Sequence, residues 1–279
     1  YFPPYFSWIS QRVTKKTFYR WLKIEKFFKF FFDLIDIAYP QNSETNFFLK
    51  KLNVKNIKTI GNIKFIGDDD FKNKNIDKKL LLKFKKYKTF VAASTHSSEE
   101  IYAAKTHILL KKKIKNLVTI IIPRHINRIE QIISEIKDLN LNVVTHSSKN
   151  KRLKNVDIFI VDTFGESKKF YKIATTVFLG KSIIKKEDLA HLGGSGQNPL
   201  EPARFGAKIL HGPNVDNFKE IYKYLYSLKI SSKVKTPQEC ASATIFKKNY
   251  KKVKKMKNLS KIILKNTLNE LNKSIHNEI

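Results

Sequence analysis

The fold is decided by residues 88–125, KTFVAASTHSSEEIYAAKTHILLKKKIKNLVTIIIPRH. An apolar strand over Thr89–Ala93 is followed by a polar turn, a helix over Glu99–Lys112 and a second strand over Leu117–Pro123. The second strand is apolar at nearly every position, as is typical of a strand that is covered on both faces. A strand, a helix and a strand of these lengths predict a right-handed β–α–β unit, in which the two strands are parallel.

The same alternation continues towards the C-terminus. Further strands are expected over Asn142–His146, Val156–Val161, Thr176–Leu179 and Lys208–His211, and further helices over Asn127–Leu139, Ser167–Ala174 and Leu200–Phe205. Strands that alternate with helices place a chain in the α/β class. The C-terminal part is therefore predicted to contain a complete doubly wound parallel sheet.

The first 72 residues are predicted to form a separate and smaller part of the fold. The elements expected there are a helix over Thr14–Phe32, a strand over Ile35–Pro40, a helix over Ser43–Leu52 and a strand over Lys58–Ile63. The polar, lysine-rich run Lys72–Lys79 is the expected boundary between the two parts. Residues 247–279 are expected to form one or two basic helices, which either cap the C-terminal domain or cross back to brace the N-terminal one.

The composition indicates a folded protein with an anionic partner. The chain has 279 residues, of which 42% are hydrophobic, enough for one large or two medium domains. Its formal net charge of +31 favours attraction to nucleic acid, anionic lipid or a phosphorylated substrate, and the alternative is a bias towards lysine on a solvated surface. The single cysteine, Cys240, leaves no pair for a disulfide within the sequence. No apolar run has the length that a transmembrane helix requires.

The expected helix Thr14–Phe32 combines many aromatic residues with many basic ones. Such a helix can lie on an anionic membrane surface, with its lysines among the headgroups and its rings below them. It can equally be a core helix with one solvent-exposed face, because the aromatic positions occupy more than one helical stripe.

Polar residues gather in the turns that follow the predicted strands. In an open parallel sheet, ligands bind outside the carboxyl ends of the strands, and all of these turns belong to that one edge. Arginine suits phosphate, and glycine lets a backbone approach a nucleotide closely. The start of the Leu200 helix adds amides for a phosphate and Glu201 for sugar hydroxyls. A nucleotide-type ligand is therefore predicted. Each residue taken alone could instead have an ordinary structural role, such as a helix cap. The turns are Ser94–His96, Pro123–His125, Asp162–Glu166, Gly180–Ser182 and Gly193–Glu201.

Five segments together resemble the 3-deoxy-D-manno-octulosonic acid (Kdo) transferases, which build the inner core of lipopolysaccharide on lipid A. They extend from about Ile9 to about Glu239 and follow the order of the family. The segments are Gly61–Phe65 (GNIKF), Ala93–Glu100 (ASTHSSEE), Pro123–His125 (PRH), Asp162–Glu166 (DTFGE) and Gly193–Glu220, which contains GQNPLEPA.

The resemblance implies the GT-B architecture, two Rossmann-like domains that use CMP-Kdo as donor without a metal ion or other cofactor. Residues 1–72 would be the C-terminal part of the acceptor-binding domain, 73–245 the CMP-Kdo domain and 246–279 the C-terminal helices. The residues that match the family's CMP contacts are Pro123, Arg124, Phe164, Gly165, Glu166, Asn198, Pro199, Leu200 and Glu201, with Ser94, Thr95, Gly194 and Gln197 as supporting candidates.

The chain also departs from the family pattern. The match begins partway into the N-terminal domain, so the family's catalytic glutamate is expected upstream of residue 1 and no catalytic residue is assigned here. Gln197 stands where many members have histidine, and Ser182–Leu192 is longer than usual.

The partners that the resemblance implies are CMP-Kdo, a lipid A precursor and an anionic membrane surface at the cytoplasmic face of the inner membrane. No nucleic acid is expected. The alternatives are a GT-B transferase with another nucleotide sugar, a remnant that only binds CMP and, less in keeping with the motifs, a basic nucleic-acid-binding protein.

Overall fold

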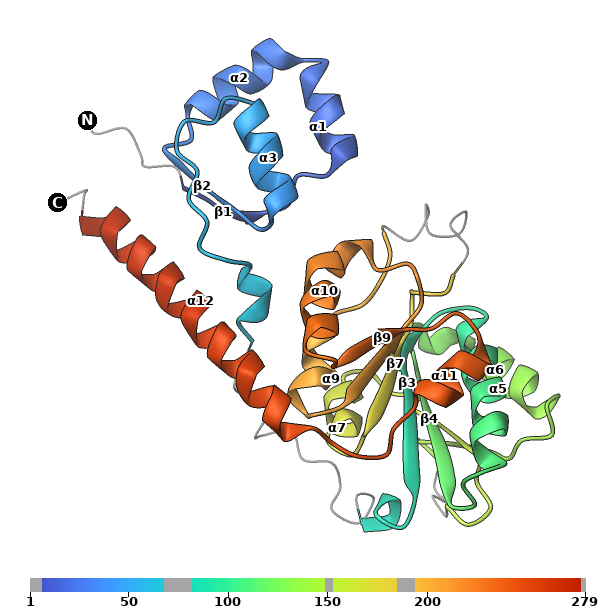
Figure 1. The fold of residues 1–279 in the computed structure, drawn as a ribbon. Coiled ribbons are helices and arrows are strands. Elements are labelled where there is room, and N and C mark those ends of the chain that lie inside the picture. The colour runs from blue at the N-terminus through green and yellow to red at the C-terminus, as the bar shows by residue number, and fades with distance from the viewer. Residues whose placement is uncertain (1–6, 68–81, 149–152, 185–193, 277–279) are drawn as a thin grey trace. The chain divides into compact units, whose positions relative to one another are not determined.

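The computed structural model describes residues 7–67, 82–148, 153–184 and 194–276 (Figure 1). The chain divides into two compact units, residues 1–67 together with 257–279, and residues 68–256. The expected boundary Lys72–Lys79 lies outside the described residues. The roles assigned to residues 1–72, 73–245 and 246–279 stay predictions.

The larger unit is built on one parallel sheet (Figure 1). Its strand pairs among the described residues are all parallel, as predicted. Among the described residues the sheet has seven strands, in the order β5 (Val143–Thr145), β6 (Ile158–Ile160), β4 (Leu117–Pro123), β3 (Lys88–Thr95), β7 (Thr176–Leu179), β8 (Lys208–His211) and β9 (Ser231–Lys233).

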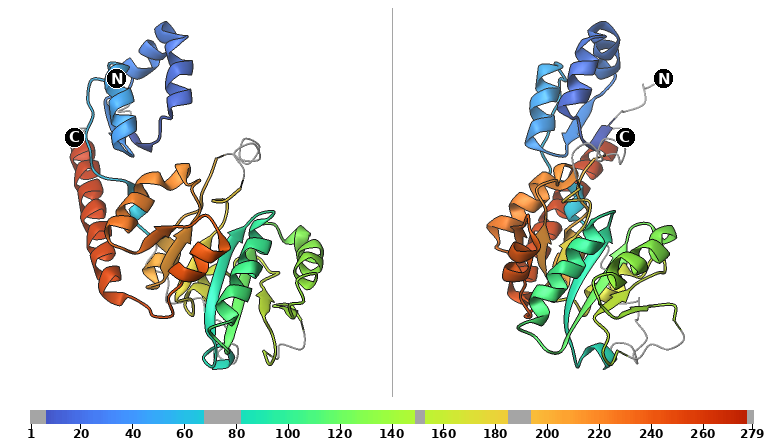
Figure 2. Two further views of the ribbon diagram at one scale, coloured as in Figure 1. Left: turned by 45° about the vertical axis from the view of Figure 1, so that its right-hand side comes forward. Right: turned by 90° about the vertical axis from the view of Figure 1, so that its right-hand side faces the viewer.

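Helices connect these strands and cover both faces of the sheet (Figure 2). They are α5 (Glu99–Lys111), α6 (Ile129–Lys137), α7 (Ser167–Tyr171), α9 (Leu200–Arg204), α10 (Lys219–Ser227) and α11 (Pro237–Ala243), with the short 3-10 helices η3 (Ile126–Arg128) and η4 (Asp216–Phe218). The predicted α/β class is confirmed.

Strand β6 illustrates why the strands are almost continuously apolar. Ile158 and Ile160 belong to the core cluster that includes Ile132 of α6. Phe159 lies between them and points to the opposite face, where its ring packs against Phe170 of α7 with centroids 6.0 Å apart. These side chains are all 0% exposed, because alternate residues of the strand face two different helix layers.

The smaller unit contains a two-stranded parallel sheet with helices beside it. Most of α12 (Tyr250–His276), from Lys257 onward, also belongs to this unit. There the Lys58 ammonium lies 2.9 Å from the Glu270 carboxylate, and the Ser260 hydroxyl donates to the Phe65 carbonyl at 2.6 Å. The other elements are β1 (Ser7–Gln11), α1 (Lys15–Leu22), α2 (Glu25–Asp33), β2 (Ile37–Pro40), α3 (Ser43–Lys51) and η1 (Ile63–Phe65).

Two expectations for this unit are wrong. The helix expected over Thr14–Phe32 is two helices, because Ile24 takes a non-helical conformation with φ −127° and ψ 46°. The strand expected over Lys58–Ile63 is not formed: Ile57 makes one isolated bridge to Ala38. Gly61, at φ +99°, then turns the chain so close to α12 that a Cβ there would lie 2.9 Å from Ile263. Among the described residues, no helix is both long enough and apolar enough to span a bilayer.

Candidate functional site

The sheet topology brings the predicted turns to one edge. The strand order reverses at β3, which has β4 on one side and β7 on the other, and such a switch point is where open α/β sheets bind ligands. The turns after β3, β4, β6 and β7 all lie at the carboxyl edge because the strands are parallel. The segment before α9 joins them, since the Gly196 N–H donates to the Lys181 carbonyl at 2.7 Å.

A buried carboxylate ties the turns after β3 and β7 together. Glu99 is 0% exposed, and its Oε2 accepts hydrogen bonds from the backbone N–H groups of His96 at 3.0 Å and Lys181 at 2.7 Å. Its Oε1 accepts from Ser182 at 2.9 Å and Ile183 at 3.0 Å. Burial raises the pKa of Glu99, and these four N–H groups oppose that rise by stabilising the carboxylate. The backbone N–H groups of the turn after β7 are therefore already hydrogen-bonded within the protein.

Gly180 has a structural reason to be glycine. A Cβ at this position would lie 2.6 Å from Glu99 Oε2 and 2.7 Å from the Thr95 Cα, and closer still to the Ser94 carbonyl oxygen. The two turns pack directly against each other, and this close contact requires a residue without a side chain at position 180.

Basic groups converge beside these turns. The Arg124 N–H donates to the Thr95 carbonyl at 2.9 Å, which extends the β3–β4 pairing and leaves the Arg124 side chain exposed. The rings of His96 and His125 meet edge to face, with centroids 5.4 Å apart. Burial and the nearby charge of Arg124 lower the pKa of Lys181. The edge therefore presents positive charge at the end of the central strands.

His96 is neutral at neutral pH. It is 6% exposed, and its Nδ1–H donates to the Ser94 carbonyl at 3.2 Å. Burial lowers the pKa of His96 from 6.5 to about 4, and the positive groups around it, His125, Lys181 and Arg124, act in the same direction. The ring therefore serves as a hydrogen-bonding group in the turn.

This pKa predicts a pH-dependent contribution to stability. The unfolded chain binds more protons at His96 than the folded one between about pH 4 and pH 6.5, so folding is weakened as the pH falls through that window. Relative to a His96→Asn variant, which keeps a donor for Ser94, the wild type is expected to lose free energy of unfolding between pH 6.5 and about 4. Urea unfolding of both proteins across this range checks the prediction. A constant difference would contradict it.

The turn after β6 is open. Phe164 is 75% exposed, and a Cβ added to Gly165 would meet no atom within 4 Å. The Glu166 carboxylate lies 2.7 Å from the Lys169 ammonium and 3.9 Å from His146 Nε2. An exposed aromatic ring beside a carboxylate is suited to a planar base with hydrogen-bonding groups.

Helix α9 begins at Leu200, as predicted. Asn198 Oδ1 accepts a hydrogen bond from the Leu200 N–H at 3.0 Å, although the N-cap position is Pro199, which makes no side-chain cap. Pro199 and Leu200 are buried, and their contact with a ligand stays a prediction. Glu201 is half-buried and lies near α7: burial raises the pKa of Tyr171, and the Glu201 carboxylate adds to the rise.

The supporting candidates are mainly structural. Thr95 is 0% exposed, and Ser94 takes a left-handed conformation at φ +55°. Gly194, at φ +97°, lies against the side chain of Asn217. The Gln197 carbonyl accepts a hydrogen bond from the Tyr222 hydroxyl at 3.1 Å. These residues shape the edge, and their ligand contacts stay predictions.

The sequence interpretation did not single out Glu99, and it named Lys181 only as part of the turn Gly180–Ser182. Glu99 lies in the quoted segment ASTHSSEE, but an acidic residue in the first turn of a helix usually faces solvent. Its burial depends on β7 lying next to β3, which the pattern alone does not specify. Lys181 lies in the turn that follows the predicted strand Thr176–Leu179.

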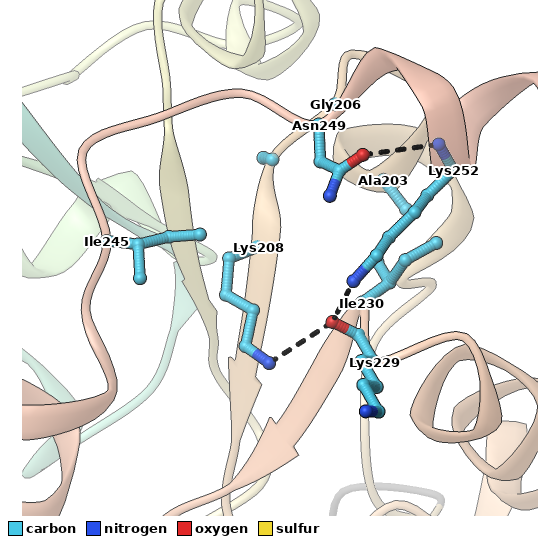
Figure 3. A pocket seen from close by; sticks show the side chains of 9 residues that line it. Ala203, Gly206, Lys208, Lys229, Ile230, Ile245, Asn249 and Lys252 are labelled. Atoms are coloured by element: carbon cyan, nitrogen blue, oxygen red, sulfur yellow. Dashed lines mark hydrogen bonds between the residues drawn. The ribbon is translucent and has the colours of Figure 1, made fainter.

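A small cavity lies at the opposite edge of the sheet, around Lys208, the first residue of β8 (Figure 3). Its volume of about 30 Å³ has room only for water. Lys208 Nζ and Lys252 Nζ both donate to the Lys229 carbonyl, at 3.5 Å and 2.9 Å. No group of three or more His, Cys, Asp or Glu within the described ranges could hold a metal ion, and the absence of a cofactor stays a prediction.

Comparison with known proteins finds several relatives among curated sequences. The 3-deoxy-D-manno-octulosonic acid transferase of Rickettsia prowazekii is 29% identical over 231 residues, which cover 83% of this chain and 48% of that protein. The transferase of the same name from Haemophilus influenzae is 29% identical over 181 residues, covering 64% of this chain and 39% of that protein. No protein-family model matches. The chain spans about half the length of the curated relatives it matches.

Among solved structures, the C-terminal CMP-Kdo binding domain of WaaA from Acinetobacter baumannii has a similar fold. The TM-score is 0.52 at 20% identity, over 68% of this chain and 96% of that domain. The likeness supports the predicted GT-B class of the α/β fold, in which a parallel sheet carries interleaved helices. The chain is thus similar in sequence to 3-deoxy-D-manno-octulosonic acid transferases and similar in fold to one CMP-Kdo binding domain.

Proposed function

We propose that this chain is part of a glycosyltransferase that moves Kdo from CMP-Kdo to a lipid A precursor, lipid IVA, in lipopolysaccharide core synthesis. In this proposal the carboxyl edge of the larger sheet holds CMP. The observation that carries it is the convergence of the family-matching turns at the switch point beside β3. The sequence similarity to named Kdo transferases supports the choice of sugar.

The residues at the edge suit the parts of CMP. The exposed Arg124 side chain can bind the phosphate with two parallel hydrogen bonds. Phe164 offers a ring for the cytosine, and Glu201 accepts hydrogen bonds from ribose hydroxyls. In the reaction, a carboxylate base removes a proton from an acceptor hydroxyl, the oxygen attacks the anomeric carbon of Kdo, and CMP leaves. Arg124 offsets the charge that develops on the leaving phosphate.

A calorimetric titration with CMP and UDP tests the donor assignment. The proposal expects CMP to bind and UDP not to displace it. Tighter binding of UDP would indicate a transferase for another nucleotide sugar. Binding of RNA that weakens steeply with salt, without any response to CMP, would indicate a nucleic-acid-binding protein. CMP binding by a full-length protein that transfers no Kdo would contradict the proposed reaction.

The proposal includes docking to an anionic membrane, such as the cytoplasmic face of the inner membrane, through one face of α2. The side chains of this face recur at intervals of three and four residues, which places them on one side of a helix. The opposite side packs into the unit through Phe32, which is 4% exposed. Lys26 and Lys29 are exposed beside the apolar face and suit anionic headgroups. The face consists of Phe27, Phe30 and Phe31 of α2, with Ile24 and Leu34 at its two ends; these are 65%, 68%, 47%, 52% and 50% exposed.

Replacement of Phe27 and Phe30 by serine is expected to reduce partitioning onto anionic vesicles by roughly tenfold or more, because two rings no longer leave water. A matched control is Tyr226→Ser with Tyr250→Ser, which removes two rings that are 67% and 65% exposed elsewhere. Vesicle co-sedimentation with anionic and zwitterionic lipid measures the effect. Equal losses for the two pairs would contradict docking through α2.

A further inference from the structure

We propose that Lys181 is a second anion-binding residue of the edge, sharing the ligand's phosphate with Arg124, and that Glu99 is the residue that positions it. The inference rests on the proposed function, because the anion it names is the phosphate of CMP. It adds a lysine outside the family-matching CMP segments and explains a buried carboxylate that the proposed reaction does not use.

The backbone places Lys181 and Arg124 on two sides of the same strand. Arg124 N–H donates to the carbonyl of Thr95 at the end of β3, and Gly180 N–H donates to the Ala93 carbonyl at 2.9 Å. Arg124 therefore continues β4, and Lys181 continues β7, with β3 between them. Backbones two strands apart are separated by about 10 Å, a gap that a long arginine and a long lysine side chain can close around a phosphate.

The backbone of Lys181 is held in an unusual conformation. Its φ is +57°, in the left-handed region that disfavours residues with side chains. Glu99 holds it there by accepting hydrogen bonds from Lys181 and from the next two residues, Ser182 and Ile183. Strained backbone that the surrounding structure holds in place is concentrated at ligand sites. The turn is thus fixed before any ligand binds.

Lys181 also links the edge to the segment before α9. Its carbonyl accepts the hydrogen bond from Gly196 N–H, so one residue connects the turn after β7 with the loop that leads to Asn198. The charges of Arg124 and Lys181 are close enough for Arg124 to lower the pKa of Lys181. Two neighbouring cations repel each other. A phosphate that accepts hydrogen bonds from both side chains offsets that repulsion.

The first test compares CMP with cytidine, which has the same base and sugar but no phosphate. Lys181→Gln is expected to weaken CMP binding roughly tenfold, as for loss of a charge-assisted hydrogen bond, and to leave cytidine binding unchanged. Lys181→Arg should retain most of the CMP affinity. Lys105→Gln, at an exposed position of α5, removes the same charge and should change neither.

The second test asks whether Glu99 acts through Lys181. Glu99→Gln places an amide N–H₂ against backbone N–H groups, so it should weaken CMP binding, and the double variant with Lys181→Gln should be no weaker than Lys181→Gln alone. Additive losses would overturn the positioning role. If circular dichroism shows that Glu99→Gln does not fold, the CMP affinities of the Lys181 variants test the inference. Wild type that binds no CMP would refute the proposed function, whereas CMP binding that Lys181→Gln leaves unchanged would refute only this inference.

Discussion

Replacement of Arg124 by alanine is expected to weaken CMP binding by more than tenfold. Arg124 follows the central strand β4, and its backbone is fixed by the hydrogen bond to Thr95, while its side chain is exposed at the edge. A guanidinium that makes two parallel hydrogen bonds to a phosphate is a strong, charge-assisted contact. The substitution leaves the backbone bond in place, so the loss should come from the side chain alone.

Calorimetry with CMP and cytidine separates this effect from a general disturbance. Arg124→Ala should lower the affinity for CMP and leave the affinity for cytidine unchanged, because only CMP has the phosphate. Arg124→Lys should give an intermediate loss, since lysine keeps the charge but not the paired geometry. Unchanged CMP affinity in Arg124→Ala would count against the assignment of the donor site.

Replacement of Gly180 by alanine is expected to cost roughly 3 kcal/mol of unfolding free energy. The added Cβ would lie 2.6 Å from Glu99 Oε2 and 2.7 Å from the Thr95 Cα, and neither the central strand nor the four-bonded carboxylate can move easily. The turns after β3 and β7 would have to separate, which breaks the hydrogen bonds of Glu99. CMP affinity should fall together with stability.

Gly165→Ala is the matched control for this substitution. Gly165, unlike Gly180, has a positive φ, +75°, but a Cβ there would meet nothing within 4 Å. Its cost should be limited to the left-handed conformation, about 1 kcal/mol. Urea unfolding followed by circular dichroism measures both variants. Equal losses in the two would contradict the close contact between the turns.

The edge that carries the candidate site was predictable because the period of the chain specifies a parallel sheet. Once strands and helices alternate, the residues after each strand must share one edge, and the positions of Arg124 and Glu166 follow from that rule. Glu99 was not predictable in the same way. Its burial requires the turn after β7 to fold onto the turn after β3, a tertiary contact between residues more than 80 positions apart.

The smaller unit was harder to predict from local pattern. The aromatic residues of Thr14–Phe32 fill more than one stripe, and the break at Ile24 divides them between α1 and α2, each with its own buried ring, Phe18 and Phe32. Lys58–Ile63 has the composition of a strand, but Gly61 turns the chain towards Ile263 of α12. Tertiary contacts decided both cases.

The most direct test of the account follows amide chemical shifts while CMP is added. The account predicts saturable changes in the turns after β4, β6 and β7 and at the start of α9, including Arg124, Gly165, Lys181 and Leu200. Changes confined to the opposite edge, around Lys208 and Asn249 (Figure 3), or no saturable change at all, would contradict a CMP site at the carboxyl edge of the sheet.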